Sequence, residues 1–411
     1  MKETNKYLVV NPGSSSLKFS LYEMPERKEV ANCYIQKVGL EDSFYTLKIN
    51  GKKQTKEVLV KNHIDATNLM VNILLENSLV NDIKEIEGIG YRVLHGGEIY
   101  SKSIIIEEND MKNIRDLIKL GPLHQPAQII GIESMKLISP DTPIVAVFDT
   151  AFHQTMPEES YIYPVNYEWY EKHGVRKYGF HGTSYNYITN KMKTVLNNEK
   201  PNLIICHIGS GASIAAIKEG NSLNTSMGLT PLDGLMMGTR SGSIDPSIIE
   251  YMVNEGKSIE ETMDILNKKS GLVGICGKSD TRDIEKMVKE NDKQAILALK
   301  LYTNSIINYI AQYYFQLEGK LDGIVFTAGV GENSAIVRKM VVNKIGKIMN
   351  IKLDNELNKL NNSVITSKDS FGIPVFVIPT NEELMILNDT YDLVQKSKKQ
   401  KEQEKHLKKT L

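Results

Sequence analysis

The stretch that decides the fold is LVVNPGSSSLKFSLY, residues 8–22. Leu8 to Val10 reads as a short apolar strand that ends in a turn rich in glycine and serine. Leu17, Phe19 and Leu21 then alternate with polar residues, which predicts a second, half-buried strand. The turn of this hairpin offers backbone N–H groups and small hydroxyls, with Lys18 just after it. Such a turn either binds phosphate oxygens or is a plain β-turn.

The same order of features returns in the middle of the chain as LIICHIGSGASIAAI, residues 203–217. An apolar strand reaches the polar His207, a Gly/Ser turn follows, and a second strand resumes at Ile214. A third glycine turn, residues 328–334, lies between a strand at 323–327 and a helix expected at 335–349, where helix N–H groups point outward. Two domains built on one plan, each offering a phosphate-sized turn to a shared cleft, would explain the repetition.

Other periodic stretches complete the pattern of an α/β protein. Strands are expected at 88–94, 144–148 and 375–378, and helices at 65–76, 108–120, 128–137, 247–254, 258–268 and 294–318. Ligands of α/β sheets bind at the carboxyl ends of strands, where polar residues collect in this sequence. These residues are Asn11, Arg92, His95, Asp149, His207 and Glu332.

The last expected strand is followed by a predicted helix start. Thr380 and Glu383 have the spacing of a capping box, which predicts that Glu383 caps the helix. Glu382 is then left either as a solvated acid of the first turn or as a carboxylate that faces a metal.

A long loop, NTSMGLTPLDGLMMGTRSGSIDP at residues 224–246, has neither helical nor strand periodicity. Its leucines and methionines indicate that it packs against the protein rather than serving as a linker. Its lone cation, Arg240, lies among glycine and hydroxyl residues, and a guanidinium there suits a carboxylate or a phosphate. The alternative interpretation is a packed loop with an ordinary surface arginine.

Composition narrows the classes of function. A chain of 411 residues predicts two domains, and a net charge of zero argues against a large nucleic-acid footprint. No apolar run has membrane-spanning length. Three scattered cysteines fit packing residues in a reducing cytoplasm, and no Cys/His cluster indicates a zinc site.

Three common enzyme motifs are tested and fail. Gly277-Lys278-Ser279 resembles the end of a P-loop, but Leu272 stands where the first glycine is required. Gly329-Val330-Gly331 lacks the third glycine of a dinucleotide fingerprint. No Gly-x-Ser-x-Gly nucleophile elbow occurs.

Nine stretches together resemble the acetate kinase family, which belongs with sugar kinases, Hsp70 and actin. They are NPGSSSLKF (11–19), RVLHGGE (92–98), FDTAFHQTMP (148–157), YGFHGTS (178–184), HIGSGASI (207–214), TSMGLTPLDGLMMGTRSGSIDP (225–246), SGLVGICGKSDTR (270–282), FTAGVGENS (326–334) and PTNEEL (379–384). The resemblance implies an α/β fold of duplicated ribonuclease H-like (actin-like ATPase) domains around a central cleft. The expected domains are 1–150 with about 384–411, and 151–383 as the nucleotide-binding domain.

The resemblance also implies the reaction and its ligands. A phosphoryl group would pass reversibly and directly, in line, between ATP and acetate, giving ADP and acetyl phosphate. Asn11 and Glu382 would hold Mg²⁺, with Mn²⁺ as an alternative. Arg92 would bind the substrate, and His124 matches a family position near it. The protein is expected to be a cytoplasmic homodimer with no nucleic-acid or membrane partner.

Catalytic and nucleotide-binding residues follow from the same resemblance. Asp149 would be the catalytic acidic residue, with His181 and Arg240 stabilising the transition state. Acetate is already ionised at neutral pH, so Asp149 is expected to orient a cation or a water rather than to remove a proton. The expected nucleotide-binding residues are Lys18, His207, Ile208, Gly209, Ser210, Gly211, Asp280, Thr281, Arg282, Gly329, Val330, Gly331, Glu332 and Asn333.

The sequence departs from the family pattern at several positions. The family usually has histidine where Tyr91 and Tyr185 stand, asparagine at Ser210 and aspartate at Ser243. The Ser210 change lies in a nucleotide loop and is expected to alter nucleotide affinity or preference. Two alternatives stay open: a propionate or butyrate kinase with a different pocket size, and a non-catalytic ATP-binding module of the actin and Hsp70 type.

Overall fold

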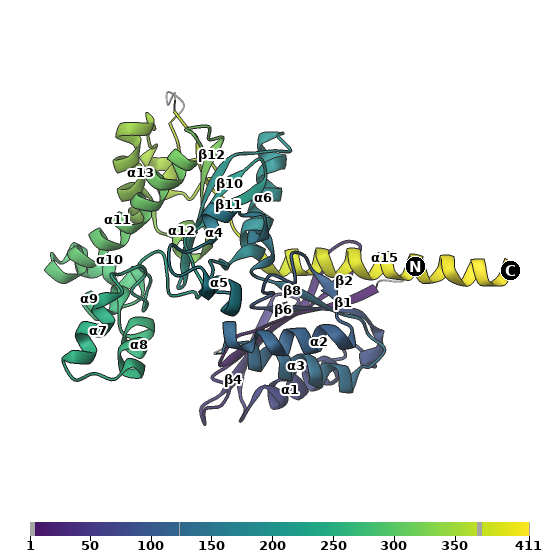
Figure 1. Ribbon diagram of the computed structural model, residues 1–411. Helices are drawn as coiled ribbons and strands as arrows, with labels where there is room; N and C mark the ends of the chain where they lie inside the picture. The colour runs from purple at the N-terminus through teal and green to yellow at the C-terminus, as the bar shows by residue number, and fades with distance from the viewer. Residues whose placement is uncertain (1–4, 123, 368–371, 411) are drawn as a thin grey trace. The chain divides into compact units, whose positions relative to one another are not determined.

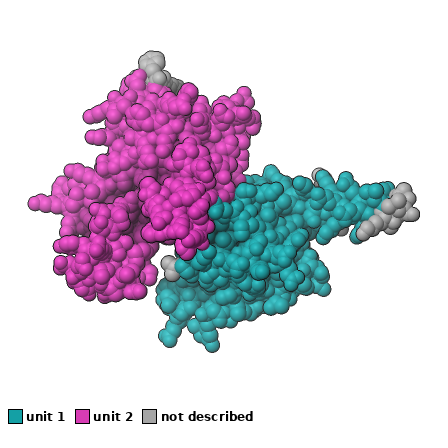
Figure 2. Space-filling view, viewed as in Figure 1, with its two compact units in different colours: residues 1–151, 381–411 teal, residues 152–380 magenta. Residues whose placement is uncertain are grey.

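The computed structural model describes residues 5–122, 124–367 and 372–410. The chain folds into two compact units, coloured separately in Figure 2. Unit 1 comprises Met1–Ala151 and Asn381–Leu411, and unit 2 comprises Phe152–Thr380. Each unit is built on its own mixed β-sheet.

The sheet of unit 1 has the strand order β5-β4-β3-β2-β1-β6-β8-β7. Neighbours from β5 to β1 are antiparallel, whereas β1, β6 and β8 are parallel to one another. The strands are β1 (Asn5–Pro12), β2 (Ser16–Met24), β3 (Lys28–Gln36), β4 (Phe44–Ile49), β5 (Lys52–Glu57), β6 (Ile86–Val93), β7 (Ile104–Ile105) and β8 (Ile144–Phe148).

Both faces of this sheet are covered by helices (Figure 1). Leu8 and Val10 of β1 belong to the core under the helices on one face, while Tyr7 and Val9 belong to the core under α15 on the other. This alternation follows from the two-residue period of a strand. The helices of unit 1 are α1 (His63–Glu76), η1 (Ile83–Glu85), α2 (Glu108–Asp116), η2 (Leu117–Leu120), α3 (Gln125–Ile138) and α15 (Glu382–Thr410).

The close approach of α15 to the sheet depends on glycine in β6. A Cβ on Gly90 would lie 2.3 Å from Thr390 Oγ1 and 2.6 Å from Ile386 Cγ2, both on α15. A Cβ on Gly88 would meet Tyr7 and Val394 at 2.9 Å. Only a residue without a side chain leaves room for the helix at these positions.

The sheet of unit 2 has the order β11-β10-β9-β12-β13. Here too the first three strands are antiparallel neighbours and the next two run parallel to β9. The strands are β9 (Leu203–Ile208), β10 (Ala212–Lys218), β11 (Asn221–Thr225), β12 (Gly323–Thr327) and β13 (Val375–Val377).

Helices also flank this second sheet. Ile188 and Met192 of α6 pack on Leu203 and Ile205 of β9, and α11 lies against β9 and β10. The helices of unit 2 are η3 (Ala151–Thr155, which starts at the last residue of unit 1), α4 (Glu158–Tyr161), α5 (Glu168–His173), α6 (Gly182–Leu196), α7 (Ser247–Asn254), α8 (Ile259–Lys268), α9 (Gly271–Cys276), α10 (Thr281–Lys289), α11 (Lys293–Gln316), α12 (Ala328–Asn333), α13 (Ala335–Met349) and α14 (Asn355–Lys359).

The predicted duplication is confirmed by strand order. The series β3-β2-β1-β6-β8 and β11-β10-β9-β12-β13 have the same sequence of antiparallel and parallel pairings. The two stretches that repeat in the sequence, 8–22 and 203–217, form the equivalent hairpins β1–β2 and β9–β10. The hairpin is therefore the repeated core of each unit.

Two local predictions were wrong. The glycine-rich segment 328–334 is not a turn but the short helix α12, with Ala328 at a positive φ of 65°. Thr380 and Glu383 do not form a capping box, because the N–H of Leu384 donates to Asn381 Oδ1 at 2.9 Å. Asn381 thus caps α15, and the Glu383 carboxylate serves another contact described below.

The cysteines and the hydropathy of the helices can be compared with the expectations from the sequence. Cys33, Cys206 and Cys276 are free and buried, as expected of packing residues. Among residues 5–122, 124–367 and 372–410, no helix has both the length and the apolar character needed to cross a membrane.

Candidate active site

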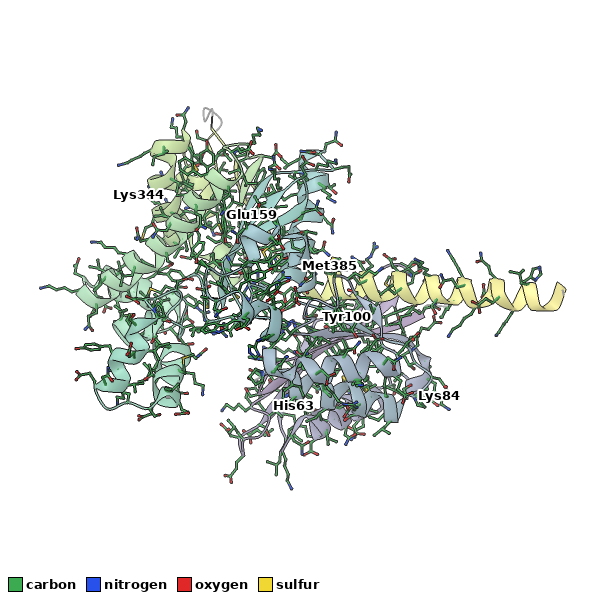
Figure 3. The ribbon with its side chains drawn as sticks, viewed as in Figure 1. His63, Lys84, Tyr100, Glu159, Lys344 and Met385 are labelled. Atoms are coloured by element: carbon green, nitrogen blue, oxygen red, sulfur yellow. The ribbon has the colours of Figure 1, made fainter. Side chains whose placement is uncertain are left out.

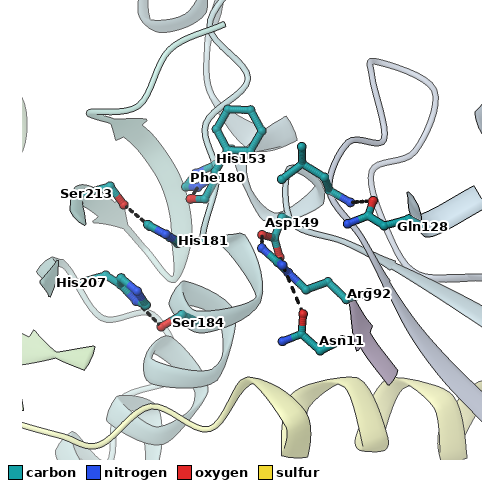
Figure 4. Close-up of polar contacts among 11 residues, drawn as sticks. Asn11, Arg92, Gln128, Asp149, His153, Phe180, His181, Ser184, His207 and Ser213 are labelled. Carbon is teal, nitrogen blue, oxygen red and sulfur yellow. Dashed lines mark hydrogen bonds and ion pairs between the residues drawn. The ribbon is translucent and has the colours of Figure 1, made fainter. Parts of the chain in front are cut away.

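The parallel strands of unit 1 bring three polar side chains together at their carboxyl ends (Figure 4). Asn11 lies in β1, Arg92 in β6, and Asp149 directly after β8. Arg92 Nε donates to Asp149 Oδ1 at 3.1 Å, its Nη2 forms an ion pair with Asp149 Oδ2, and its Nη1 donates to Asn11 Oδ1 at 3.2 Å. The two contacts to Asp149 hold the guanidinium plane in a fixed orientation.

The electrostatics of this cluster keep Arg92 charged. Burial alone would lower the pKa of Arg92, but the adjacent Asp149 carboxylate outweighs it and raises the pKa. Asp149 is only 1 % exposed. A carboxylate that is buried and engaged by a guanidinium orients that cation, and the predicted catalytic role of Asp149 stays a prediction.

Glu382, the first residue of α15, faces the same cluster. Burial and the neighbouring Asp149 raise its pKa, Arg92 and Lys18 lower it, and the pKa that results is about 7. An additional cation beside Glu382 would therefore be stabilised. The oxygen donors of Glu382 and Asn11 are hard ligands of the kind that Mg²⁺ prefers, so the residues present fit a magnesium ion.

Lys18 and Glu383 form a second polar contact in unit 1. Lys18 Nζ makes an ion pair with Glu383 Oε1, and Ser20 Oγ donates to Glu383 Oε2 at 2.5 Å. The contact joins β2 to the start of α15, which is why Glu383 does not cap its own helix. The predicted contact of Lys18 with nucleotide stays a prediction.

Two histidines of unit 1 lie at the starts of helices. His63, labelled in Figure 3 at the start of α1, donates from Nε2 to the carbonyl oxygen of Gly13 at 2.9 Å and so holds the turn of the first hairpin. His124 occupies the N-cap position of α3 and is half-buried. Its predicted place near the substrate remains a prediction.

Unit 2 contains a pair of stacked histidines (Figure 4). The rings of His181 and His207 lie 4.1 Å apart with an interplanar angle of 20°. His181 Nδ1 is 2.8 Å from Ser213 Oγ, and His207 Nδ1 is 2.8 Å from Ser184 Oγ. Each ring is thus oriented by a serine hydroxyl on a neighbouring element.

The backbone at His181 is itself constrained. Its φ is 58°, a left-handed conformation that costs a non-glycine residue about 1 kcal/mol or more. His153 Nε2 donates to the preceding carbonyl oxygen, that of Phe180, at 3.0 Å, and its Nδ1 lies 2.8 Å from Ser222 Oγ. Both ring nitrogens of His153 are therefore engaged in hydrogen bonds, and its bond to Phe180 helps to hold the backbone just before His181.

Arg240 lies near His181. A Cβ placed on Gly211 would be 3.5 Å from Arg240 Nη1 and 3.6 Å from His181 Nε2. The guanidinium contacts the carbonyl oxygen of Pro231 at 3.3 Å and Met237 Sδ at 3.7 Å, and among the described residues it forms no ion pair. Burial lowers the pKa of Arg240. A partly desolvated cation with only neutral contacts attracts an anion.

The loop that carries Arg240 is packed, as its leucines and methionines predicted. Met227, Leu235 and Met237 are fully buried. Its backbone also bonds to neighbouring helices: the Ser241 N–H donates to Leu266 O, and the N–H groups of Leu272 and Val273 donate to carbonyls of this loop. Arg240 therefore lies on a packed segment, and its side chain is half-buried.

A cavity of about 510 Å³ lies within unit 2, a volume typical of small-molecule sites. It brings together eight of the residues expected to bind nucleotide: Gly209, Ser210, Asp280, Thr281, Arg282, Gly329, Val330 and Asn333. His207, Ile208, Gly211, Gly331 and Glu332 do not line it.

Two side chains of this cavity, Glu285 of α10 and Tyr302 of α11, lie outside the nine stretches that carry the resemblance, and sequence reasoning missed them. Five further lining residues lie inside those stretches but were not predicted to bind nucleotide: Gly238, Thr239, Leu272, Ser279 and Ser334. Glu285 accepts a hydrogen bond from Ser334, at the start of α13. Its position three residues after Arg282, on the same helical face, was the available signal.

Arg338 anchors the cavity wall from behind. It is fully buried, and burial lowers its pKa to about 10. Its guanidinium donates to the carbonyl oxygens of Gly331, Glu332 and Asn358 and to the side-chain oxygens of Asn358 and Asn361. These five bonds tie α12 to α14 and fix the glycine-rich segment that lines the cavity.

Comparison with known proteins bears on this arrangement. A family model described as the Acetokinase family matches residues 6–388. The chain is 46% identical to the acetate kinase of Bacillus cytotoxicus, over 95% of this chain and 99% of that protein. Two solved structures are similar over 95% of this chain and all of theirs, each at 40% identity: a propionate kinase from Francisella tularensis (TM-score 0.90) and the acetate kinase of Porphyromonas gingivalis (TM-score 0.89).

Proposed function

This chain belongs to the acetokinase family, and from that premise we propose how its residues transfer a phosphoryl group. The protein is an enzyme of the phosphotransferase class that acts on acetate, with ATP and ADP as the nucleotide pair. The observation that carries the site assignment is Arg240, a partly buried guanidinium with only neutral contacts among the described residues.

Unit 2 binds the nucleotide in this proposal. The cavity of about 510 Å³ is lined by two glycine-rich segments, around Gly209 and Gly329, whose backbone lies open to a ligand. A Cβ on Gly329 would meet nothing within 4 Å, so this wall leaves room for a base, ribose or phosphate. Ser210 also lines the cavity, and we assign it to nucleotide affinity or preference.

Unit 1 supplies the metal ligands and an anion-binding group. Asn11 and Glu382 would hold Mg²⁺, which when bound neutralises charge on the phosphate oxygens. Arg92, held by Asp149, would bind the carboxylate of acetate or the phosphoryl group of acetyl phosphate. Asp149 orients Arg92 and removes no proton, because acetate at neutral pH is already ionised.

The phosphoryl group passes in line between an oxygen of the nucleotide and an oxygen of acetate. Arg240 and His181 act on this group during the transfer. Charge on its equatorial oxygens is the chief obstacle, and oriented donors offset it without reorganisation during the reaction. Both side chains face the backbone at Gly211 in unit 2. Their contacts with Ser213, Pro231 and Met237 hold them in place before substrate arrives.

The alternatives are less well supported. A purely nucleotide-binding module would not need the second guanidinium site that Arg92 forms with Asp149 and Asn11. A propionate or butyrate preference would differ in pocket size alone, and the curated relative at 46% identity is an acetate kinase.

The decisive experiment is a hydroxamate assay for acyl phosphate with ATP and acetate, propionate or butyrate, each with Mg²⁺, with Mn²⁺ and with a chelator. We expect acyl phosphate from acetate at the highest rate, and none once the metal is chelated. No acyl phosphate from any of the three acids would refute the function. Unchanged rates in chelator would remove the metal from the proposal.

We also place the enzyme in the cytoplasm and in homodimers, with no nucleic-acid or membrane partner. Its three buried free thiols fit a reducing compartment, and its net charge is zero. A second copy would cover exposed apolar side chains such as Tyr251 and Ile259, which are 64 % and 59 % exposed. Sedimentation equilibrium reporting only a monomer at assay concentration would contradict the dimer.

A further inference from the structure

A short chain of hydroxyl groups leads to His181 from inside unit 2. The hydroxyl of Tyr185, on the first turn of α6, lies 2.5 Å from Ser213 Oγ in β10. Ser213 Oγ in turn lies 2.8 Å from His181 Nδ1. Tyr185 and Ser213 are both fully buried, so bulk water does not compete for these bonds.

The proposal assigns this chain one direction. The Tyr185 phenol is protonated at neutral pH and can donate to Ser213 Oγ, while Thr225 is a second hydrogen-bond partner of the same phenol. With Tyr185 as the donor, the single hydroxyl proton of Ser213 is directed at His181 Nδ1. A ring nitrogen that accepts a hydrogen bond carries no proton, so the proton of the neutral imidazole must lie on Nε2.

The surroundings of Nε2 suit a donor. Both Nε2 and the Arg240 guanidinium face the backbone at Gly211, 3.6 Å and 3.5 Å from the position of an added Cβ. The ring of His207 stacks on the face of the His181 ring. A neutral imidazole with a proton on Nε2 can still donate to an anion there.

We propose that Tyr185, acting through Ser213, is a positioning residue that holds His181 in the tautomer protonated on Nε2. This N–H then donates to the transferring phosphoryl group, a step that rests on the function proposed above. The proposal gives a role to Tyr185, one of the departures noted in the sequence.

The direct test is the tautomer of His181 by long-range ¹H–¹⁵N correlation in histidine-labelled protein. The signal is assigned by its loss in His181→Gln. We expect Nε2 protonated and Nδ1 unprotonated in the unmodified protein, and a mixture of tautomers in Tyr185→Phe. A proton on Nδ1 in the unmodified protein, or an unchanged tautomer in Tyr185→Phe, would overturn the relay.

Kinetics provide the second readout. Tyr185→Phe is expected to lower kcat roughly tenfold or more while leaving the KM for ATP unchanged, because the lost orientation affects a donor used in the transition state. Tyr187→Phe makes the same chemical change on the same helix, outside the relay, and should keep both the tautomer and kcat. If Tyr185→Phe alters the tautomer but not kcat, the catalytic role of the relay is wrong.

Two controls distinguish a failure of the relay from a variant that does not fold and from a failure of the proposed function. Ser213→Ala removes the central hydroxyl and should also mix the tautomers, which keeps the test decisive if Tyr185→Phe does not fold. Absence of acyl phosphate from the unmodified enzyme would refute the proposed function and with it the donation to phosphoryl. The tautomer measurement would still decide whether Tyr185 and Ser213 set the protonation of His181.

Discussion

At the scale of single residues, the two arginines of the candidate site are held in opposite ways. Arg92 is paired with a buried carboxylate, which raises its pKa, whereas Arg240 contacts a carbonyl and a sulfur, and burial lowers its pKa. A buried cation without a counter-ion costs stability. In the proposed function, Arg240 therefore serves a ligand alone, while Arg92 combines a ligand role with a structural ion pair.

We predict that Arg240→Ala lowers kcat at least a hundredfold, because one oriented donor to the transferring group is lost. Arg240→Lys should restore little, since a lysine has no planar fork. The melting temperature of Arg240→Met should stay equal to or above that of the unmodified enzyme, because an unpaired charge is removed. The hydroxamate assay and calorimetry measure the two effects.

Arg115→Ala is the matched control for this prediction. Arg115 pairs with Glu133 on the surface of unit 1, and its side chain is 52 % exposed. Its removal should leave kcat unchanged. Near-normal turnover in Arg240→Ala would exclude Arg240 from the chemistry.

At the scale of elements, the position of α15 on the sheet of unit 1 determines where Glu382 lies. The helix packs on β1, β6 and β8, and its first residue faces Arg92 and Asp149. Gly88 and Gly90 permit this approach, as an added Cβ would collide with helix side chains. Two residues without side chains in a strand thus help to position a carboxylate at the start of a helix.

We predict that Gly90→Ala lowers the free energy of unfolding by about 1–3 kcal/mol, the usual cost of overpacking. Because the added methyl group pushes against Thr390 and Ile386, α15 should shift and Glu382 with it. Thermal unfolding measures the first effect, and a higher Mg²⁺ requirement in the hydroxamate assay measures the second.

Gly329→Ala serves as the control for unfolding alone, since nothing lies within 4 Å of its added Cβ. Its melting temperature should equal or exceed that of the unmodified protein. A Gly90→Ala protein as stable as the Gly329→Ala protein would show that the close approach of α15 is not required.

At the scale of the whole molecule, the two units repeat one strand plan but carry different chemistry. In unit 1, residues at the carboxyl ends of the parallel strands form an arginine, carboxylate and amide cluster, whereas unit 2 has the cavity, the stacked histidines and Arg240. In the function proposed above, residues of each unit contribute to the transfer of a single phosphoryl group.

We predict that the effects of Arg92→Ala and Arg240→Ala on kcat/KM for acetate do not multiply. If each alone costs roughly a hundredfold, independent groups would cost about 10⁴-fold together. Groups that act on the same transition state are instead strongly non-additive, so the double variant should be little slower than the slower single variant. Losses that multiply fully would show that the two arginines act in separate steps.

Much of the fold could be predicted from local pattern. The expected strands at 144–148 and 323–327 and the helices at 247–254 and 335–349 coincide with β8, β12, α7 and α13. Their apolar periodicity is strong and is punctuated by glycine, proline or polar residues. By contrast, β3, β4 and β5 were not predicted. All six residues of β5 are exposed, so its sequence carries no alternation of buried and exposed positions.

The candidate site, like the fold, could be predicted from the sequence only in part. The sequence by itself determined which residue types stand at the strand ends and, through long matching motifs, the family. Only the tertiary structure decided that Glu383 pairs with Lys18 rather than capping α15, that Glu285 and Tyr302 line the cavity, and that Tyr185 reaches His181 through Ser213. Motifs and periodicity are properties of neighbours along the chain, whereas these contacts join side chains that come together only when sheets and helices pack.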